Sequence, residues 1–316
     1  TNLDSWTLRF APLGGDGFVV LASGDASISG TLGTLDPGLL VNGPYVLELT
    51  ATDIAGRATT DRRIIEVATG VKTGSFTQTT TDLTTTIAGV ELSLSRTYRS
   101  LAALSGLSGS LGQGWTLDGF DPRFALNLPP TGQEAVGIFP PLTDGTRLYV
   151  NLPDGTRAGF TFTPTQVTQT GLTYYTPAWT PDAGVGFSLS SADAKLTKIG
   201  GQYFQLGTGL SYNPASGGFK GYDYALADNA SGTTYQYDTQ DGLRAIVNSA
   251  GTRLLVSDSG IVGPDGSRLS LQADAGGRIT GFTGPDGARV GYRFDALGRL
   301  EGVTSASGDK TTLGYQ

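Results

Sequence analysis

The side chains best suited to catalysis are missing from this chain. Its 316 residues contain no histidine and no cysteine. The first absence excludes a Ser-His-Asp triad and any histidine-ligated metal, and the second excludes thiolate nucleophiles, thiolate metal sites and disulfides. Acid-base chemistry would fall to carboxylates, for example Asp36 with Asp53 as a glycosidase pair. No motif supports that pairing, so we expect no catalytic residue, no cofactor and no enzyme.

Aspartate recurs beside glycine, a pattern found both in cation-binding loops and in turns. Asp-Gly pairs begin at residues 16, 144, 154, 241, 265 and 286. None of them has the Asp-x-Asp-x-Asp-Gly spacing of a calcium loop. Asp-Gly also supplies the positive φ angles of tight hairpin turns. We therefore expect turns at these positions and no metal site, with calcium as the alternative.

Three aromatic residues offer a different binding chemistry. Tyr174, Tyr175 and Trp179 lie close to Pro177 and Pro181 in the sequence. Such rings can stack on a sugar, but they more often pack in a core. We expect core packing here.

One predicted strand carries a positive charge on its apolar face. Between residues 90 and 99 apolar residues alternate with polar ones, and Arg96 falls on the same side as Leu94 and Tyr98. A buried guanidinium needs a partner. We expect Arg96 to bond to backbone carbonyls or to a carboxylate, and not to a ligand.

Composition restricts the partners of the chain. A net charge of −7 argues against nucleic acid, which requires a basic face. No apolar run reaches the roughly 18 residues that would indicate a membrane span, and no signal peptide is recognisable at the start. The chain lacks an initiator methionine and its pattern stops partway through a unit. We therefore expect it to be part of a longer protein.

Short strands separated by turn signals predict an all-β fold. Four of them, at 6–10, 18–21, 45–51 and 63–67, predict an immunoglobulin-like β-sandwich over residues 1–70. The pattern changes at 71–125, and from 126 to 316 strand follows strand. No convincing helix is present, because the only stretch with helical apolar periodicity, near 101–111, is broken by glycine.

A repeat dominates the C-terminal quarter. Residues 277–290 are echoed at 298–308, and Gly263-Pro264-Asp265-Gly266 precedes a second Gly-Pro-Asp-Gly, which begins at Gly284. Both echoes are offset by 21 residues. A fixed period of about this length marks supersecondary units that cannot bury their apolar faces alone. An array of such units holds or presents something more often than it catalyses.

Two further sets of residues form motifs. Residues 235–243 and 292–300 are similar to the pattern Tyr-x-Tyr-Asp-x-x-Gly-Arg-Leu, and residues 94–100 with 112–115 place Gly-x-Gly-Trp after an Arg-x-Tyr-x-Ser strand. The first set resembles the repeat, and the second the shell-opening segment, of the Rhs/YD-repeat family, whose bacterial members are related to the Tc-toxin C components and to the animal teneurins. The repeat residues are Tyr235, Tyr237, Asp238, Gly242, Gly277, Arg278, Tyr292, Phe294, Asp295, Gly298 and Arg299, and the shell-opening residues are Arg96, Tyr98, Gly112, Gly114 and Trp115.

Within one unit, turn chemistry suggests a role for each residue. Asp238 and Asp295 can accept turn amides, Gly298 can take a left-handed conformation, and Arg299 can cover an aromatic ring or pair with an aspartate. The chain also departs from the family. Phe294 replaces a tyrosine, and residues 239–243 insert one residue and lack the arginine. The shell-closing core motif and the self-cleaving aspartate pair are absent, so autoproteolysis is not carried over.

The resemblance covers roughly residues 72–316 and implies a fold and a function. The fold is a hairpin ribbon that winds into a hollow β-cocoon, with 71–125 as its opening segment and 126–316 as the ribbon. The function is to enclose a C-terminal polypeptide, often a toxin, in a secreted or cell-surface protein. The expected partners are the rest of the chain and, beyond it, secretion machinery or cell-surface glycans. The alternative is a cell-surface adhesion or glycan-binding protein.

Overall fold

The computed structural model describes residues 2–15 and 17–315. Asp16, where one Asp-Gly turn was expected, lies outside the described residues. Nearly all regular structure is β-strand, arranged in antiparallel sheets, which confirms the predicted all-β class. Among the described residues the only α-helix is α1, Ser100–Leu104, and three short 3-10 helices occur at Pro37–Leu39, Glu134–Val136 and Pro214–Ser216.

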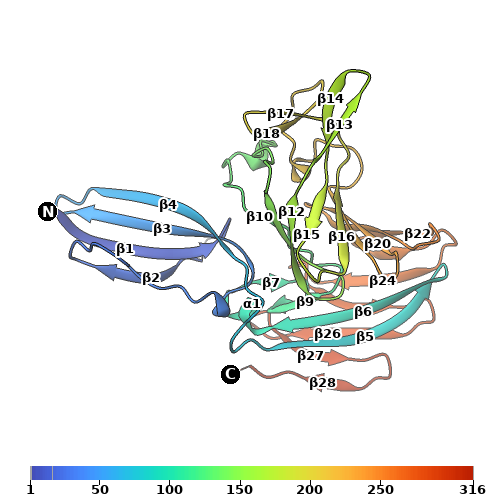
Figure 1. Cartoon of the computed structure of the whole chain (residues 1–316). Coiled ribbons are helices and arrows are strands. Elements are labelled where there is room, and N and C mark those ends of the chain that lie inside the picture. The colour runs from blue at the N-terminus through green and yellow to red at the C-terminus, as the bar shows by residue number, and fades with distance from the viewer. Residues whose placement is uncertain (1, 16, 316) are drawn as a thin grey trace.

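The N-terminal residues form one sheet that projects from the rest of the molecule (Figure 1). Its four strands lie in the order β2-β1-β3-β4, with β1 Leu3–Pro12, β2 Val19–Gly24, β3 Gly43–Asp53 and β4 Ala58–Val67. A sandwich needs a second sheet, and none packs on this one among the described residues. The segment between β2 and β3 has no period-two apolar pattern and forms a loop, to which Trp6 Nε1 donates a 3.0 Å hydrogen bond at Ala26 O. The predicted immunoglobulin-like sandwich is therefore corrected to a single sheet.

The opening segment is built on a long hairpin. Strands β5, Thr77–Ile87, and β6, Val90–Arg99, pair along their full length, and β9, Trp115–Leu117, adds a third strand to β6. Between them lie α1 and a small hairpin of β7, Ser108–Gly109, and β8, Gly112–Gln113. The helix α1 differs from the expectation of no helix, but glycine stops it early, as Gly106 has a φ of 67°.

Between residues 125 and 205 the strands form two four-stranded sheets, except for one strand at 187–191 that joins the ribbon, so the ribbon is not continuous from residue 126 as expected. One has the order β10-β11-β12-β15, with β10 Ala125–Leu126, β11 Arg147–Asn151, β12 Arg157–Phe162 and β15 Trp179–Pro181. The other has the order β13-β14-β17-β18, with β13 Thr165–Gln169, β14 Leu172–Thr176, β17 Leu196–Ile199 and β18 Gln202–Gln205. Trp179 and Tyr174 are buried in this part, as core packing predicts.

The ribbon itself is a sheet of 11 strands, almost all in chain order. It contains β16 Phe187–Ser191, β19 Tyr224–Asp228, β20 Thr234–Asp238, β21 Gly242–Val247, β22 Arg253–Ser257, β23 Gly260–Val262, β24 Arg268–Ala273, β25 Ile279–Thr283, β26 Arg289–Phe294, β27 Leu300–Thr304 and β28 Lys310–Thr312. From β19 onward short turns join its successive strands, so each strand covers the edge of the one before.

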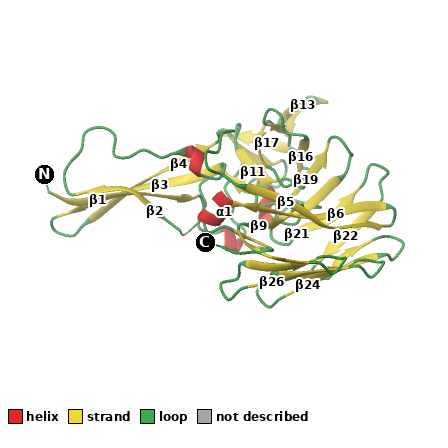
Figure 2. Cartoon of the chain, turned by 90° about the horizontal axis from the view of Figure 1, so that it is seen from below, coloured by secondary structure: helices red, strands yellow, loops and turns green. Residues whose placement is uncertain are grey.

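The hairpin of β5 and β6 lies over one face of the ribbon. Figure 2 shows it as a layer above β24 and β26. Buried side chains from both layers belong to one hydrophobic cluster, with Leu94 and Trp115 from the opening segment and Phe282, Tyr292 and Leu300 from the ribbon. The opening segment therefore supplies the apolar surface that the repeats cannot supply for themselves.

Candidate functional site

The repeat turn is held by one aspartate in each unit. In the last unit, Oδ1 of Asp295 accepts hydrogen bonds from the backbone N–H groups of Leu297, at 2.9 Å, and Arg299, at 2.8 Å, and Oδ2 accepts from Arg299 Nε at 2.8 Å. Asp274, at the same position of the preceding unit, makes the same three kinds of bond to Gly276 and Arg278. The backbone N–H of Arg299 and its guanidinium hold the pKa of Asp295 below its ordinary value.

Glycine takes the left-handed position of these turns. Gly277 and Gly298 both have a φ of 77°, and Gly242 has a φ of 78°. A residue with a Cβ is strained in that region. The spacing of the glycines therefore follows from the turn geometry.

Each unit also contacts the next through a cation–π interaction between an arginine and an aromatic ring. The guanidinium carbon of Arg278 lies 4.9 Å from the ring centroid of Phe294, and that of Arg299 lies 4.9 Å from the ring centroid of Tyr315. The two pairs have the same spacing along the chain. Cation–π contacts at this distance are favourable, so each unit gains this stabilisation only when its successor is in place.

A β-bulge recurs with the same period. The pairing register shifts between Gln272 and Ala273 in β24 and again between Arg293 and Phe294 in β26. A bulge bends a strand and increases its local twist. Because it occurs once in each unit, it gives the ribbon a regular source of curvature.

A buried ion pair joins the opening segment to the repeats. Arg96 on β6 pairs with Asp82 on β5, and both side chains are 5% exposed. Oδ2 of Asp82 also accepts a 2.8 Å hydrogen bond from the Tyr292 hydroxyl on β26. Burial, together with the charge of Asp82, raises the pKa of Tyr292 well above its ordinary value. A carboxylate partner for Arg96 is thus confirmed.

A second contact lies at the tryptophan of the opening segment. Trp115 Nε1 donates a 2.9 Å hydrogen bond to the Tyr315 hydroxyl, which in turn donates to Leu300 O at 2.6 Å. The rings of Trp115 and Tyr98 have centroids 5.1 Å apart. Sequence reasoning missed Tyr315, although it follows Phe294 by one full period of the repeat.

Two glycines allow the opening segment to approach closely. A Cβ on Gly112, where φ is 91°, would lie 2.5 Å from Gly298 O in the repeat turn. A Cβ on Gly114, where φ is 75°, would lie 2.7 Å from the Cβ of Ala103 and 2.8 Å from the Tyr98 ring. Nearby, the backbone N–H of Ile279 donates to Ser110 O at 2.9 Å. We call these contacts, with the Asp82 and Trp115 contacts above, the seam.

The earlier repeat unit lies outside the seam and is less regular. The buried hydroxyl of Tyr237 donates a 2.9 Å hydrogen bond to Gly119 O, and the Tyr235 ring packs beside the same glycine. Asp238 accepts the backbone N–H groups of Gln240 and Asp241, at 2.8 and 3.0 Å. Because the arginine of the motif is missing, no guanidinium from the described part of the chain folds back onto Asp238.

Three of the other Asp-Gly aspartates bond within their own turns. Asp154, Asp265 and Asp286 each accept a backbone N–H two residues further on. Asp144 instead accepts a 2.5 Å hydrogen bond from the Tyr203 hydroxyl and forms an ion pair with Lys198. Turn bonding thus accounts for the first three carboxylates.

Comparison with known families identifies segments on both sides of the seam. Residues 274–312 match the family model described as RHS Repeat, and residues 68–121 match a family described as Domain of unknown function (DUF6531). No curated protein matches the chain. The first match indicates a structural repeat protein and supports the resemblance to Rhs/YD-repeat proteins. Within the described residues, no helix is long and apolar enough to cross a membrane.

Proposed function

We propose that this chain is the starting end of a β-shell that encloses a C-terminal polypeptide, which we expect to be a toxin, in a secreted or cell-surface protein. The observation that carries the proposal is the seam. The opening segment lies on the apolar face of the repeat sheet and is joined to it through Asp82 with Tyr292 and Trp115 with Tyr315. The face of the ribbon formed by its last strands is thereby covered by residues from the same chain.

The outer edge of this same part of the ribbon is suited to growth. β28 is the last strand of the sheet, its side chains are exposed, and its outer edge pairs with no described strand. An unpaired edge is a template for another strand. A further repeat unit would add its hairpin there, and its bulge would continue the curvature. The partners of this chain are then further repeats and the polypeptide they enclose, with secretion machinery as an outside partner.

The role proposed for the repeat residues is mechanical. Asp274 and Asp295 are engaged by turn amides and arginines, and Arg278 and Arg299 by carboxylates and rings. Such groups stabilise a wall and do not activate a substrate. We therefore propose a non-enzymatic shell that acts by keeping its contents apart from the surroundings.

Limited proteolysis of the natural gene product tests this function. We expect the polypeptide that follows the repeats to resist protease while the shell is folded and to be digested once urea opens it. The same polypeptide produced alone is the control for its intrinsic susceptibility. Digestion at the same rate in both settings would contradict enclosure and favour an exposed adhesive surface, and so would a natural chain that ends soon after residue 316.

A further inference from the structure

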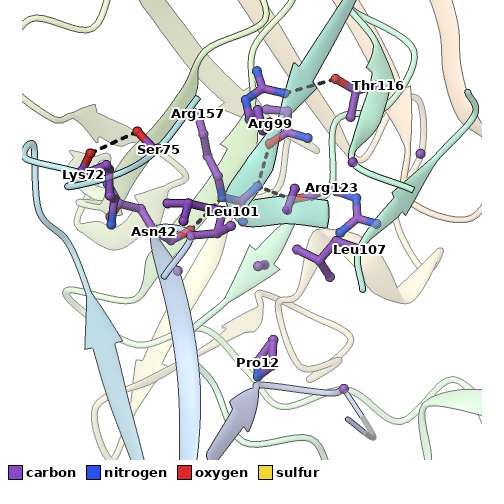
Figure 3. A pocket seen from close by; sticks show the side chains of 18 of the residues that line it. Pro12, Asn42, Lys72, Ser75, Arg99, Leu101, Leu107, Thr116, Arg123 and Arg157 are labelled. Carbon is purple, nitrogen blue, oxygen red and sulfur yellow. Dashed lines mark hydrogen bonds between the residues drawn. The ribbon is translucent and has the colours of Figure 1, made fainter. Parts of the chain in front are cut away.

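A cavity of about 610 Å³ lies where the N-terminal sheet meets the opening segment. Figure 3 shows it from close by. Its walls come from the ends of β1 and β3, from the linker at 69–77, and from residues around α1, β9 and β12. Residues from both parts of the molecule therefore face the same space. Gly114 and Trp115, which belong to the seam, also line it.

The charge of this cavity is opposite to that of the protein. Four cationic side chains line it, and no aspartate or glutamate does so among the described residues; the four are Lys72, Arg99, Arg123 and Arg157. The whole chain has 28 acidic and 21 basic residues. A concentration of positive charge in one hollow of an acidic protein is the arrangement that attracts an anion.

The three arginines bond only to neutral groups. Arg157 donates from Nε to Asn42 O at 2.7 Å and from Nη1 to Asn151 Oδ1 at 2.9 Å, and Arg123 donates to Ser108 O. Within the described residues, none of the three has a carboxylate oxygen within 4.0 Å. Their charges are therefore not neutralised by a direct ion pair.

Arg99, at the end of β6, has the least satisfied guanidinium. Its Nη1 donates to Thr116 Oγ1 at 3.1 Å, while its Nη2 is buried and has no hydrogen-bond partner. A buried donor without a partner costs free energy, more so when it is charged. A bound oxyanion would supply the missing acceptor.

Nearby carboxylates offset part of this charge from a distance but bond to other groups and not to the arginines. Asp118 accepts Thr97 Oγ1 at 2.8 Å, and Asp121 accepts the backbone N–H groups of Ser110 at 3.0 Å and Leu117 at 2.8 Å. Burial lowers the pKa of Arg99 despite the field of Asp118. Burial, followed by the charge of Arg123, lowers the pKa of Arg157 to about 10.

The rest of the cavity is largely apolar and aromatic. Its lining includes Tyr45, Leu101, Leu107, Trp115 and Phe124. A volume of this size lies within the range of about 300 to 1,000 Å³ that is usual for small-molecule sites. Together, the positive charge and the apolar lining favour a ligand with an anionic head and an apolar body.

We propose that this cavity binds a small amphiphilic carboxylic acid, with its carboxylate among Arg99, Arg123 and Arg157 and its apolar body against Leu101 and Leu107. Guanidinium groups bind carboxylates through paired, charge-assisted hydrogen bonds. Because the lining comes from both the N-terminal sheet and the opening segment, an occupied site also ties these two parts together. The proposal does not depend on enclosure of a polypeptide.

Isothermal titration calorimetry of the intact chain with sodium octanoate tests the site. We expect saturable 1:1 binding, and we expect Arg99→Gln to weaken it by about tenfold or more, since a charged hydrogen bond is lost. Arg244→Gln, at an exposed arginine paired with Asp241, is the matched control and should leave the affinity unchanged. Circular dichroism of each variant checks that it is folded.

Two further ligands test separately how much the anionic head and the apolar body contribute to binding. We expect 1-octanol, which has the same chain without the charge, and inorganic phosphate, which has charge without the chain, to bind at least about tenfold more weakly than octanoate. Equal binding of octanol would overturn the role of the arginines, and equal binding of phosphate would overturn the role of the apolar lining. Absence of octanoate binding, or binding unchanged in folded Arg99→Gln, would overturn the proposal.

Discussion

The hydroxyl group of Tyr292 donates a 2.8 Å hydrogen bond to Oδ2 of Asp82, a residue 210 positions earlier in the chain. Asp82 also forms the buried ion pair with Arg96. One carboxylate thus connects both strands of the opening hairpin to a repeat strand. Its two partners lie in the two segments that match known families, residues 68–121 and 274–312.

Removing the charge of Asp82 should destabilise the whole ribbon. Asp82→Asn leaves the Arg96 guanidinium buried without a counter-charge, a change that typically costs about 3 to 5 kcal/mol. Urea unfolding followed by tryptophan fluorescence measures the loss. Asp61→Asn, which breaks an exposed pair with Arg63, is the control and should cost less than about 1 kcal/mol. Similar costs for the two variants would show that the buried pair is not a structural connection.

Tyr292→Phe should weaken the seam without disturbing its packing. The variant loses only the hydroxyl that donates to Asp82, and a hydrogen bond to a charged group contributes about 1.5 to 3 kcal/mol. Tyr175→Phe removes a more exposed hydroxyl, 3.4 Å from Gln166 Oε1, and should change the free energy of unfolding very little. A double-mutant cycle with Asp82→Asn should give a clear coupling energy. Additive effects would contradict a direct interaction in solution.

Much of the repeat could be predicted from the sequence, because its chemistry is local. The bonds of Asp295 to the turn amides and the left-handed Gly298 follow from short-range turn geometry. The parity of Arg96 likewise predicted a buried guanidinium bonded to backbone carbonyls or to a carboxylate, and the structure shows a carboxylate. The identity of that carboxylate, Asp82, and its bond to Tyr292 depend on how distant strands stack, which no local pattern specifies.

The N-terminal sheet shows the other limit of sequence reasoning. Its four strands were found at nearly the right places, but their number and spacing suggested a sandwich and the structure has one sheet. Strand patterns report which residues alternate and say little about which strands share a sheet. The arginine cavity was missed for the same reason, since Arg99, Arg123 and Arg157 come together only through the arrangement of distant elements.

Gly112→Ala should be more harmful than an alanine at another left-handed glycine. The new Cβ would lie 2.5 Å from Gly298 O, in addition to the strain of a φ of 91°. Gly145→Ala, at a φ of 75° with nothing within 4 Å, is the matched control for strain alone and should cost about 1 kcal/mol. We expect thermal unfolding to show a clearly larger loss for Gly112→Ala. Equal losses would mean that the close approach is relieved in solution.

Asp118 should make the stability of the protein depend on pH. Burial raises the pKa of Asp118 from 3.8 to about 6. Between about pH 4 and about pH 6, the folded state holds a proton on Asp118 that the unfolded state has released. The contribution of this group to stability therefore falls as the pH rises through that range. Asp118→Asn removes the titration, and its stability relative to the parent chain should improve over that range. Urea unfolding at several pH values measures the difference, and a constant difference would contradict the shift.

Cryo-electron microscopy of the natural gene product would show whether the repeats close into a shell. We expect a closed β-shell in which a strand of the next repeat pairs with β28, the opening segment covers the last described strands of the ribbon, and polypeptide density lies inside. An open ribbon with nothing enclosed, or a β28 edge left free in the natural protein, would contradict it.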